Sequence, residues 1–214
     1  MFEFFDPHAD FGIRYGNLPH WYQPGATYFI TFRTADSVPL ELSRSWYRRR
    51  AEWLRLRDID PESPNWRSQL SASDANARAY DNAFTRDFMT YRDRGHGACP
   101  FRDPRAATIV AECLAHFDGD RYSLGDFIVM PNHVHLLVCL QKNVTLEAQC
   151  ESWKSFAARR VNQLLARRGR LWQSESFDHL VRSPEHFRYF QRYIAENPRN
   201  ASLREGEYLY RPRS

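Results

Sequence analysis

The feature that most constrains this chain is the stretch FIVMPNHVHLLV at residues 127–138. Two apolar runs flank Pro131-Asn132, a pair typical of a tight turn, which predicts two antiparallel strands joined by that turn. Side chains two apart on a strand share a face, so His133 and His135 project together and Leu137 continues their face. The opposite face then carries Val134, Leu136 and Val138.

Two imidazoles placed in this way can hold one divalent cation on a rigid backbone. The same pattern also fits two histidines that pack in a core or lie on the surface. The pair by itself does not decide between these readings, and the rest of the chain has to supply further site residues.

The 214 residues suit one domain over 1–214 with an insertion, and 43% hydrophobic residues are enough for a sizeable core. We expect no contact with a membrane, because the chain has no apolar run of about 18 residues. The first residues lack a basic region followed by an apolar block, so no secretory signal is expected. We therefore expect a cytoplasmic protein. Four widely spaced cysteines predict free thiols and neither disulfides nor a zinc site: Cys99, Cys113, Cys139 and Cys150.

The charge is uneven along the chain. Residues 151–214 hold 13 basic and 7 acidic residues, a net charge of +6, which leaves −2 for residues 1–150 because the total is +4. Of the 30 basic residues, 28 are arginine. A C-terminal third rich in arginine and aromatic residues suits phosphate contacts and base stacking. An arginine-biased composition with solvated helix faces explains the same numbers equally well.

The order of the predicted elements indicates the fold class. After a turn-rich arm over residues 1–27, the chain alternates strands and helices: a strand over 28–34, a helix over 41–57, a helix over 106–117, strands over 122–130 and 133–140, a helix over 146–168 capped by Gly169, extended segments within 171–182, and a last helix from Ser183-Pro184. Four strands with two crossover helices match an α+β, ferredoxin-like split βαβ fold with an antiparallel sheet.

Residues 58–104 interrupt this pattern. Prolines and glycines recur through the stretch, although 74–91 could form a helix. We interpret it as an insertion into the domain and not as a second core.

The last helix carries further candidate residues. Phe187, Phe190 and Ile194 form its core stripe, and at about 100° per residue Tyr193 lies roughly 90° from the centre of that stripe. Asn197 follows one turn later, so Tyr193 and Asn197 share a face that need not be buried. A lone tyrosine at such a position is more often a packing residue.

Five blocks appear together in order: MPNHVHLLV at 130–138, WKSF at 153–156, LWQ at 171–173, FDH at 177–179 and YIAENP at 193–198. In this combination the chain resembles the REP-associated tyrosine transposases of the single-tyrosine HUH (TnpA-like) superfamily. The resemblance covers residues 28–34 and about 122–201. It implies a ferredoxin-like catalytic domain that cuts single-stranded or hairpin (REP-like) DNA with the tyrosine of its C-terminal helix.

The resemblance also implies roles for single residues. His133, His135 and Asn197 would bind Mg²⁺ or Mn²⁺, and Tyr193 would attack the scissile phosphate to give a 5′-phosphotyrosine and a free 3′-OH. Candidate DNA contacts are Lys154, Arg159, Arg160, Trp172, His179, Arg188 and Arg192. Trp172 could equally be a core residue.

Two rival functions remain at this stage. A non-catalytic, domesticated hairpin-binding protein would share the basic C-terminal third without needing the histidines or Tyr193. A metal-dependent hydrolase of small phosphoesters would need more acidic or histidine ligands, and only Asp126 is near in sequence. The residues do not distinguish a monomer from a homodimer.

Overall fold

The computed structural model describes residues 2–15, 19–37, 40–63, 66–71, 74–80, 83–84 and 97–213. The chain divides into two compact units, Met1–Ser37 with Ala98–Ser214, and Val38–Gly97. The second unit begins at Val38, ahead of the insertion expected from about residue 58. The helix predicted over 41–57 therefore belongs to this second unit.

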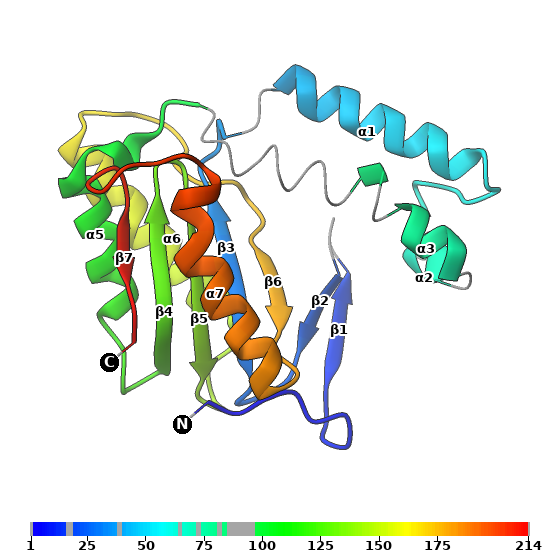
Figure 1. Cartoon of the computed structure of the whole chain (residues 1–214), viewed down its shortest axis with the longest axis horizontal. Coiled ribbons are helices and arrows are strands. Elements are labelled where there is room, and N and C mark those ends of the chain that lie inside the picture. The colour runs from blue at the N-terminus through cyan, green and yellow to red at the C-terminus, as the bar shows by residue number, and fades with distance from the viewer. Residues whose placement is uncertain are drawn as a thin grey trace. The chain divides into compact units, whose positions relative to one another are not determined.

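An antiparallel five-stranded sheet forms the centre of the first unit, in the order β6-β3-β5-β4-β7 (Figure 1). The strands are β3 (Thr27–Arg33), β4 (Tyr122–Met130), β5 (His133–Leu140), β6 (Phe177–Leu180) and β7 (Leu209–Arg211). With α5 (Pro104–Ala115) between β3 and β4 and α6 (Leu146–Leu164) between β5 and β6, the first four strands follow the split βαβ plan, so the α+β, ferredoxin-like prediction is confirmed. Strand β7 adds a fifth strand that the sequence did not suggest.

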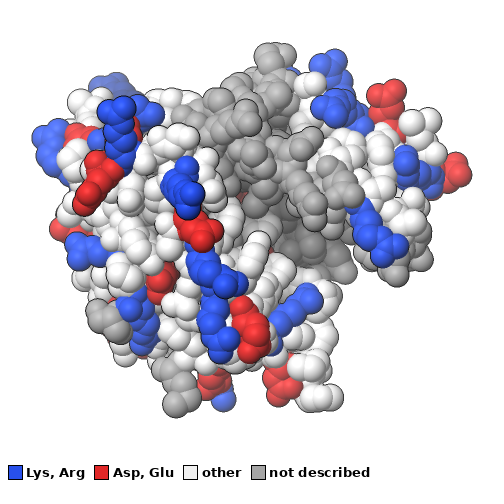
Figure 2. Space-filling view, viewed as in Figure 1, with Lys and Arg blue, Asp and Glu red and all other residues white. Residues whose placement is uncertain are grey.

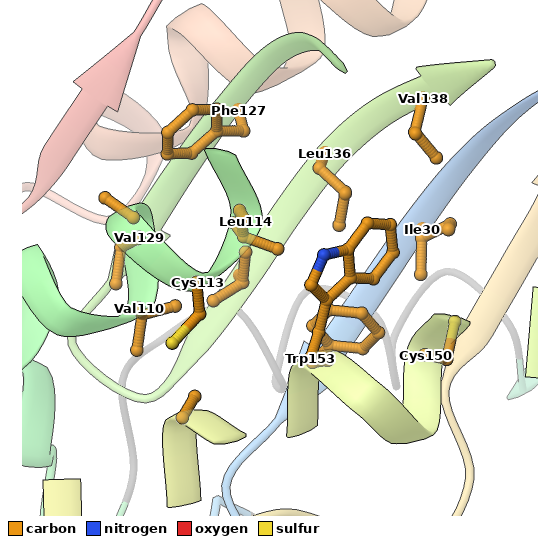
Figure 3. Close-up of a cluster of buried hydrophobic side chains, with 14 of the residues drawn as sticks. Ile30, Val110, Cys113, Leu114, Phe127, Val129, Leu136, Val138, Cys150 and Trp153 are labelled. Atoms are coloured by element: carbon orange, nitrogen blue, oxygen red, sulfur yellow. The ribbon is translucent and has the colours of Figure 1, made fainter. Parts of the chain in front are cut away.

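Helices cover both faces of this sheet: α5 and α6 lie on one side, and α7 (Pro184–Asn200) lies on the other (Figure 1). The first face packs the larger core, whose centre includes Ile30, Leu136 and Trp153 (Figure 3). The second face packs Phe29, Leu137 and the α7 residues Phe190 and Ile194. The predicted alternation of β5 is therefore confirmed, with Leu137 on the α7 side.

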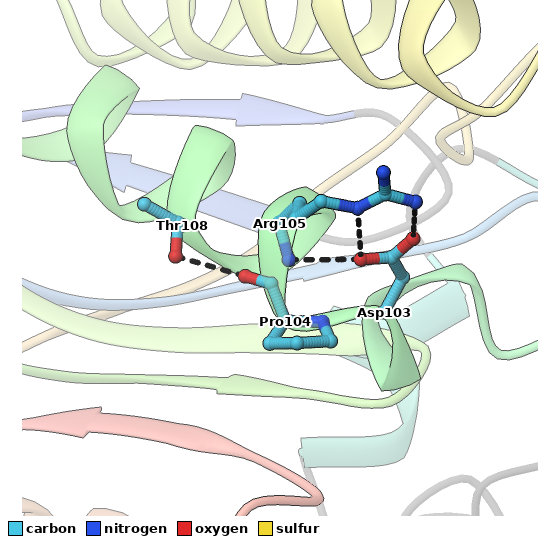
Figure 4. A network of polar contacts seen from close by, with 4 residues as sticks. All are labelled: Asp103, Pro104, Arg105 and Thr108. Atoms are coloured by element: carbon cyan, nitrogen blue, oxygen red, sulfur yellow. Dashed lines mark hydrogen bonds and ion pairs between the residues drawn. The ribbon is translucent and has the colours of Figure 1, made fainter.

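Helix α5 begins two residues earlier than expected because a local network fixes its start (Figure 4). The preceding 3-10 turn, η2 (Pro100–Arg102), leads into Asp103, whose Oδ1 accepts a hydrogen bond from the Arg105 backbone N–H at 2.9 Å. The Arg105 side chain also donates to this carboxylate, and these bonds lower the pKa of Asp103 to about 2. Pro104 occupies the first helical turn, where its missing N–H costs nothing.

Helix α6 shows the predicted stripe, in which Cys150, Trp153 and Val161 are buried. Thr145 caps its start, but the helix ends at Leu164 and not at residue 168. Gly169 is therefore not the helix cap, which corrects the prediction. Ala166 adopts the left-handed conformation first, at φ 49°, and Gly169 follows at φ 90°.

The prediction of an irregular arm over residues 1–27 is partly wrong. Strands β1 (Gly12–Tyr15) and β2 (Pro19–Tyr22) pair as an antiparallel two-stranded sheet. The residues before them are also tied down, since the Phe5 N–H donates to the Val181 carbonyl and the Thr27 N–H donates to the Glu3 carbonyl. Backbone pairing thus orders a segment that its prolines and glycines suggested would be loop.

The second unit contains α1 (Leu40–Arg55), α2 (Trp66–Ser71) and α3 (Asp74–Tyr80). Its own core groups Leu54, Ile59 and Trp66 with Leu70, Tyr80 and Phe84. This separate core corrects the expectation of an insertion without one. Of the helix expected over 74–91, the part beyond Tyr80 lies largely outside the described residues.

The four cysteines all lie in the described part of the chain as buried thiols, so the absence of disulfides is confirmed. Among the described residues, no helix combines the length and apolar character needed to cross a membrane.

Candidate active site

The pairing of β3 with β5 builds the base of the site. In this antiparallel register Thr31 lies opposite His135, and Arg33 lies opposite His133. Both histidines are fully buried, and their ring centroids are 4.7 Å apart with planes at 74°. The predicted meeting of the two imidazoles on one face therefore occurs, on the side of the sheet that α7 covers.

Hydrogen bonds set the tautomers of both rings. Asn132 Oδ1 can only accept, so His133 Nδ1, at 2.7 Å, carries the proton. The Asn197 amide Nδ2 approaches His135 Nε2 at 3.4 Å and can only donate, so the His135 proton lies on Nδ1 and reaches Thr31 Oγ1 at 2.8 Å. In each ring the lone pair is then on Nε2, which is the form that binds metal ions.

Helix α7 delivers the other two candidate residues. Ser183 caps the helix and Phe190 stacks on Phe29 of β3 at 4.3 Å between centroids, which seats the helix on the sheet. Tyr193 is half-buried, and its ring lies edge-on to His135 with centroids 5.2 Å apart. Asn197, one turn later, is 2% exposed and reaches the same imidazole. The structure thus brings together Tyr193, Asn197 and the histidine pair within one chain.

These residues fit a divalent cation. The two Nε2 atoms would be the nitrogen donors once the Asn197 amide turns, since its Nδ2 now faces His135 Nε2 at 3.4 Å. Asn197 Oδ1 is a buried amide oxygen that no hydrogen bond satisfies among the described residues. A carbonyl oxygen suits Mg²⁺ and Mn²⁺, whereas imidazole nitrogens suit transition metals, so the mixed set fits Mn²⁺ better than Mg²⁺. No cluster of three His, Cys, Asp or Glu side chains suited to a metal exists in the described ranges.

Three residues of this site were not predicted. Thr31 and Asn132 hold the imidazoles, and Arg33 is a 2% exposed arginine opposite His133. Alternation along the predicted strand over 28–34 places Thr31 and Arg33 on one face, but only the strand register shows that this face meets the histidines. Asn132 was recognised as a turn residue, whereas its side-chain bond depends on the turn geometry.

Several predicted DNA contacts are engaged elsewhere in the protein. Lys154 Nζ donates to the carbonyls of Ser174 at 2.7 Å and Gln173 at 3.4 Å, and burial lowers its pKa. Arg160 forms an ion pair with Glu112 at 2.8 Å. Arg159 is exposed, with its guanidinium 5.6 Å from the Phe156 ring centroid. All three are on α6, across the sheet from α7.

Trp172 and His179 differ in their surroundings. Trp172 is 5% exposed and packs against Phe32 and Phe101, so it is a core residue that presents no open ring for stacking. His179 is half-buried on β6 with its ring 5.1 Å from that of His186. Burial, together with His186 and Arg182, lowers the pKa of His179 to about 4, so it is neutral at pH 7.

Arg188 and Arg192 are exposed on α7, the helix that carries Tyr193. Arg188 meets Glu185 only at 3.8 Å between two well-exposed side chains, a pair that leaves the guanidinium available to a phosphate. Figure 2 shows basic side chains gathered over the α7 side of the first unit, with acidic ones between them. This surface is the basic region nearest along the chain to the candidate nucleophile.

Comparison with known proteins finds a family that part of the chain resembles. Residues 103–197 match the family model described as "Transposase IS200 like". No curated protein matches the chain. Among solved structures, the chain is similar to a REP-associated tyrosine transposase bound to a REP hairpin, with 12% identity, coverage of 87% of this chain and 74% of the other, and a TM-score of 0.47. A structure from Deinococcus radiodurans R1 described as a transposase shows 16% identity, 82% and 93% coverage and a TM-score of 0.33.

Both TM-scores are low, so these two likenesses carry no argument about the function of this chain. The matched family segment, in contrast, spans α5, the histidine hairpin, α6 and α7, and it ends at Asn197. It therefore contains every residue of the candidate site except those on β3. Residues 103–197, somewhat less than half of the chain, are thus similar to the IS200-like transposase family.

Proposed function

We propose that this protein cuts and rejoins single-stranded or hairpin DNA through a covalent 5′-phosphotyrosine at Tyr193. The observation that carries the proposal is the arrangement of α7 over β5, with the Tyr193 ring 5.2 Å from the ring of His135 and Asn197 turned to the same imidazole. A nucleophile on a helix and metal-binding side chains on a strand are the two halves that such chemistry needs.

The reaction is a transesterification. The Tyr193 hydroxyl loses its proton as its oxygen forms a bond to the scissile phosphorus and the bond from phosphorus to the 3′ oxygen breaks. The 3′ oxygen takes up one proton and leaves as a 3′-OH, so no proton is gained or lost overall. Attack of a 3′-OH on the phosphotyrosine reverses these steps and restores the phenol. No external energy source is needed, because one phosphodiester bond replaces another.

The side chains of the site divide the remaining work. His133, His135 and Asn197 would hold Mg²⁺ or Mn²⁺, which when bound acts as a Lewis acid on the phosphate oxygens. Asn132 and Thr31 keep the imidazoles in the tautomer that carries its proton on Nδ1 and its lone pair on Nε2. Phe29 and Phe190 hold α7 on the sheet so that Tyr193 stays beside the imidazoles. Because Tyr193 and both histidines come from one chain, a monomer can supply a whole site.

The DNA would reach the site along the α7 surface. Arg188 and Arg192 would contact backbone phosphates, whereas Lys154 and Arg160 already have partners within the protein. Neither arginine reads a base, so these contacts would supply affinity without sequence preference.

A non-catalytic hairpin-binding protein is the second candidate. The observation in its favour is that His133 and His135 are both fully buried, so a phosphate cannot reach them without movement of the structure around them. The small-phosphoester hydrolase is less well supported, since Asp126 is hydrogen-bonded to Gln191 and Tyr210 instead of joining the histidines.

Incubation of the protein with a 5′- or 3′-labelled hairpin oligonucleotide and Mn²⁺ tests the proposal. On a denaturing gel, the 3′ label is expected to migrate with the protein. The 5′ label is expected on a shorter free fragment that ends in a 3′-OH. A hairpin that is bound but stays intact would favour the binding protein instead.

A further inference from the structure

A buried carboxylate on β4 contacts three separate parts of the first unit. Asp126 is 5% exposed, and its Oδ1 accepts a hydrogen bond from Gln191 Nε2 of α7 at 3.1 Å and from the Arg213 backbone N–H at 3.3 Å. Its Oδ2 accepts from the Tyr210 hydroxyl of β7 at 2.9 Å. One side chain thus joins the central sheet, the tyrosine-bearing helix and the C-terminal strand.

An irregularity in β4 aims Asp126 at α7. The pairing of β4 with β5 shifts between Leu124 and Phe127, which is the signature of a β-bulge. Gly125 lies inside the bulge, and a Cβ there would be 2.9 Å from Leu137 Cβ. The strands approach too closely for any side chain at this position, so the bulge, and the direction of Asp126, depend on glycine.

Gln191 and Tyr193 lie on opposite flanks of α7. They are two residues apart, about 200° around the helix, so Gln191 faces β4 while Tyr193 faces Phe29 and His135 of the inner strands. Between them Phe190 and Ile194 make apolar contacts, which resist separation of the helix from the sheet but are not directional. The bond from Gln191 to Asp126 is a directional contact on the β4 flank that opposes rotation of the helix about its own axis, as the contact of Asn197 with His135 does on the other flank.

A small roll of α7, that is, a rotation about its own axis, would displace the Tyr193 oxygen enough to slow the proposed reaction. The end of a tyrosine side chain lies about 8 Å from the axis of its helix, so a roll of about 15° moves the phenolic oxygen by about 2 Å. A misplacement of about 1 Å between reacting groups can slow a reaction about 100-fold.

We propose that Asp126 is a positioning residue, which sets the roll of α7 through Gln191 and thereby the place of the Tyr193 oxygen. This inference rests on the proposed function only for its catalytic consequence, because the anchoring of α7 is a property of the folded protein. The carboxylate is bonded to groups of the protein itself, and Tyr210 and Arg213 hold it in place from the other side.

Exchange of the hydrogen-bond donor and acceptor between positions 191 and 126 tests the inference. Gln191→Glu sets a carboxylate against Asp126, and single-turnover cleavage of a pre-bound hairpin should slow about 100-fold. Adding Asp126→Asn restores a donor–acceptor pair with the roles reversed, and the double variant should recover to within about fivefold of the wild-type rate. Gln191→Leu removes the donor without repulsion and should also slow cleavage, while Gln163→Glu on the exposed face of α6 is the matched control for added charge.

Two other readouts separate positioning from simple loss of structure. The dissociation constant for the hairpin and the melting temperature should stay near the wild-type values in Gln191→Leu, while amide hydrogen exchange in α7 becomes faster. Wild-type rates in both Gln191 variants, or a double variant as slow as Gln191→Glu, would overturn the inference. If the wild-type protein forms no adduct, the proposed function fails, and hydrogen exchange in the same variants still tests the anchor.

Discussion

His135 and Tyr193 lie with their ring centroids 5.2 Å apart, although one is on the central strand of the sheet and the other on the helix that covers it. Thr31 on the neighbouring strand holds the far side of the same imidazole at 2.8 Å. The position of the imidazole relative to the candidate nucleophile therefore depends on three elements that are far apart in sequence.

Loss of the Thr31 hydroxyl should weaken metal use. Thr31→Val keeps the shape of the side chain but removes the partner of His135 Nδ1, so the ring can rotate and change tautomer. Losing such a supporting contact typically costs 10- to 100-fold in metal affinity or activity. A titration of cleavage against Mn²⁺ should show a correspondingly higher half-saturating concentration, and an unchanged curve would rule out this role.

The arginines of α7 should govern the salt dependence of hairpin binding. Arg188→Gln and Arg192→Gln should each weaken binding for all sequences alike and reduce the slope of log K against log salt by about 1. Fluorescence anisotropy between 50 and 200 mM salt, about the usual working range, measures this slope. Arg160→Gln is the control, since that guanidinium is paired with Glu112, and equal slopes for all three variants would contradict the assigned surface.

Replacement of Gly125 should destabilise the protein. In Gly125→Ala the new Cβ would lie 2.9 Å from Leu137 Cβ and 3.1 Å from the Leu137 carbonyl oxygen, which forces the two strands apart. Overpacking of this kind costs about 1–3 kcal/mol of unfolding free energy. Denaturant unfolding measures the loss, and Gly12→Ala, whose Cβ would meet nothing within 4 Å, should behave like the wild type.

Two histidines should make opposite contributions to the pH dependence of stability of the first unit, on either side of pH 6.5. The hydrogen bond to Asp178 raises the pKa of His20. The contribution of His20 to stability is therefore complete below pH 6.5 and is lost as the pH rises through the pKa of His20 in the folded protein. Burial lowers the pKa of His179 to about 4. The contribution of the neutral His179 to stability is therefore present above pH 6.5 and is lost as the pH falls towards 4.

Melting temperatures between pH 4 and 9 measure both effects. His179→Gln should flatten the acid side of the profile. His20→Ala should flatten the alkaline side and cost about 3 kcal/mol, because it leaves the Asp178 carboxylate buried without its partner. A profile that keeps its shape in both variants would show that other groups control the pH dependence.

Local sequence patterns were enough to predict most of the first unit. The hairpin of β4 and β5 has the predicted bounds, because the apolar runs and the Pro131-Asn132 turn define both strands. The capping residue Ser183 likewise predicted the start of α7. In contrast, β7 contains only Leu209–Arg211, too short for a period-two pattern to stand out, and it is held by pairing with β4.

The candidate site was predictable only in part. Spacing alone places His133 with His135 and Tyr193 with Asn197, since each pair lies on one element. The contacts of Thr31 with His135 and of Gln191 with Asp126 join different elements, so they depend on strand register and on how α7 packs. The separate core around Trp66 was also hidden, because its aromatic residues follow Pro61 and Pro64 at wide intervals that give no regular apolar pattern.

The most direct test of the account is to find which residue becomes attached to DNA. The covalent adduct is digested with nuclease and protease, and the modified peptide is identified by mass spectrometry. The account predicts a nucleotide on Tyr193, no adduct in Tyr193→Phe, and an undiminished adduct in Tyr189→Phe, which changes the exposed tyrosine one turn earlier on α7. A nucleotide on any other residue, or an adduct that persists in Tyr193→Phe, would contradict it.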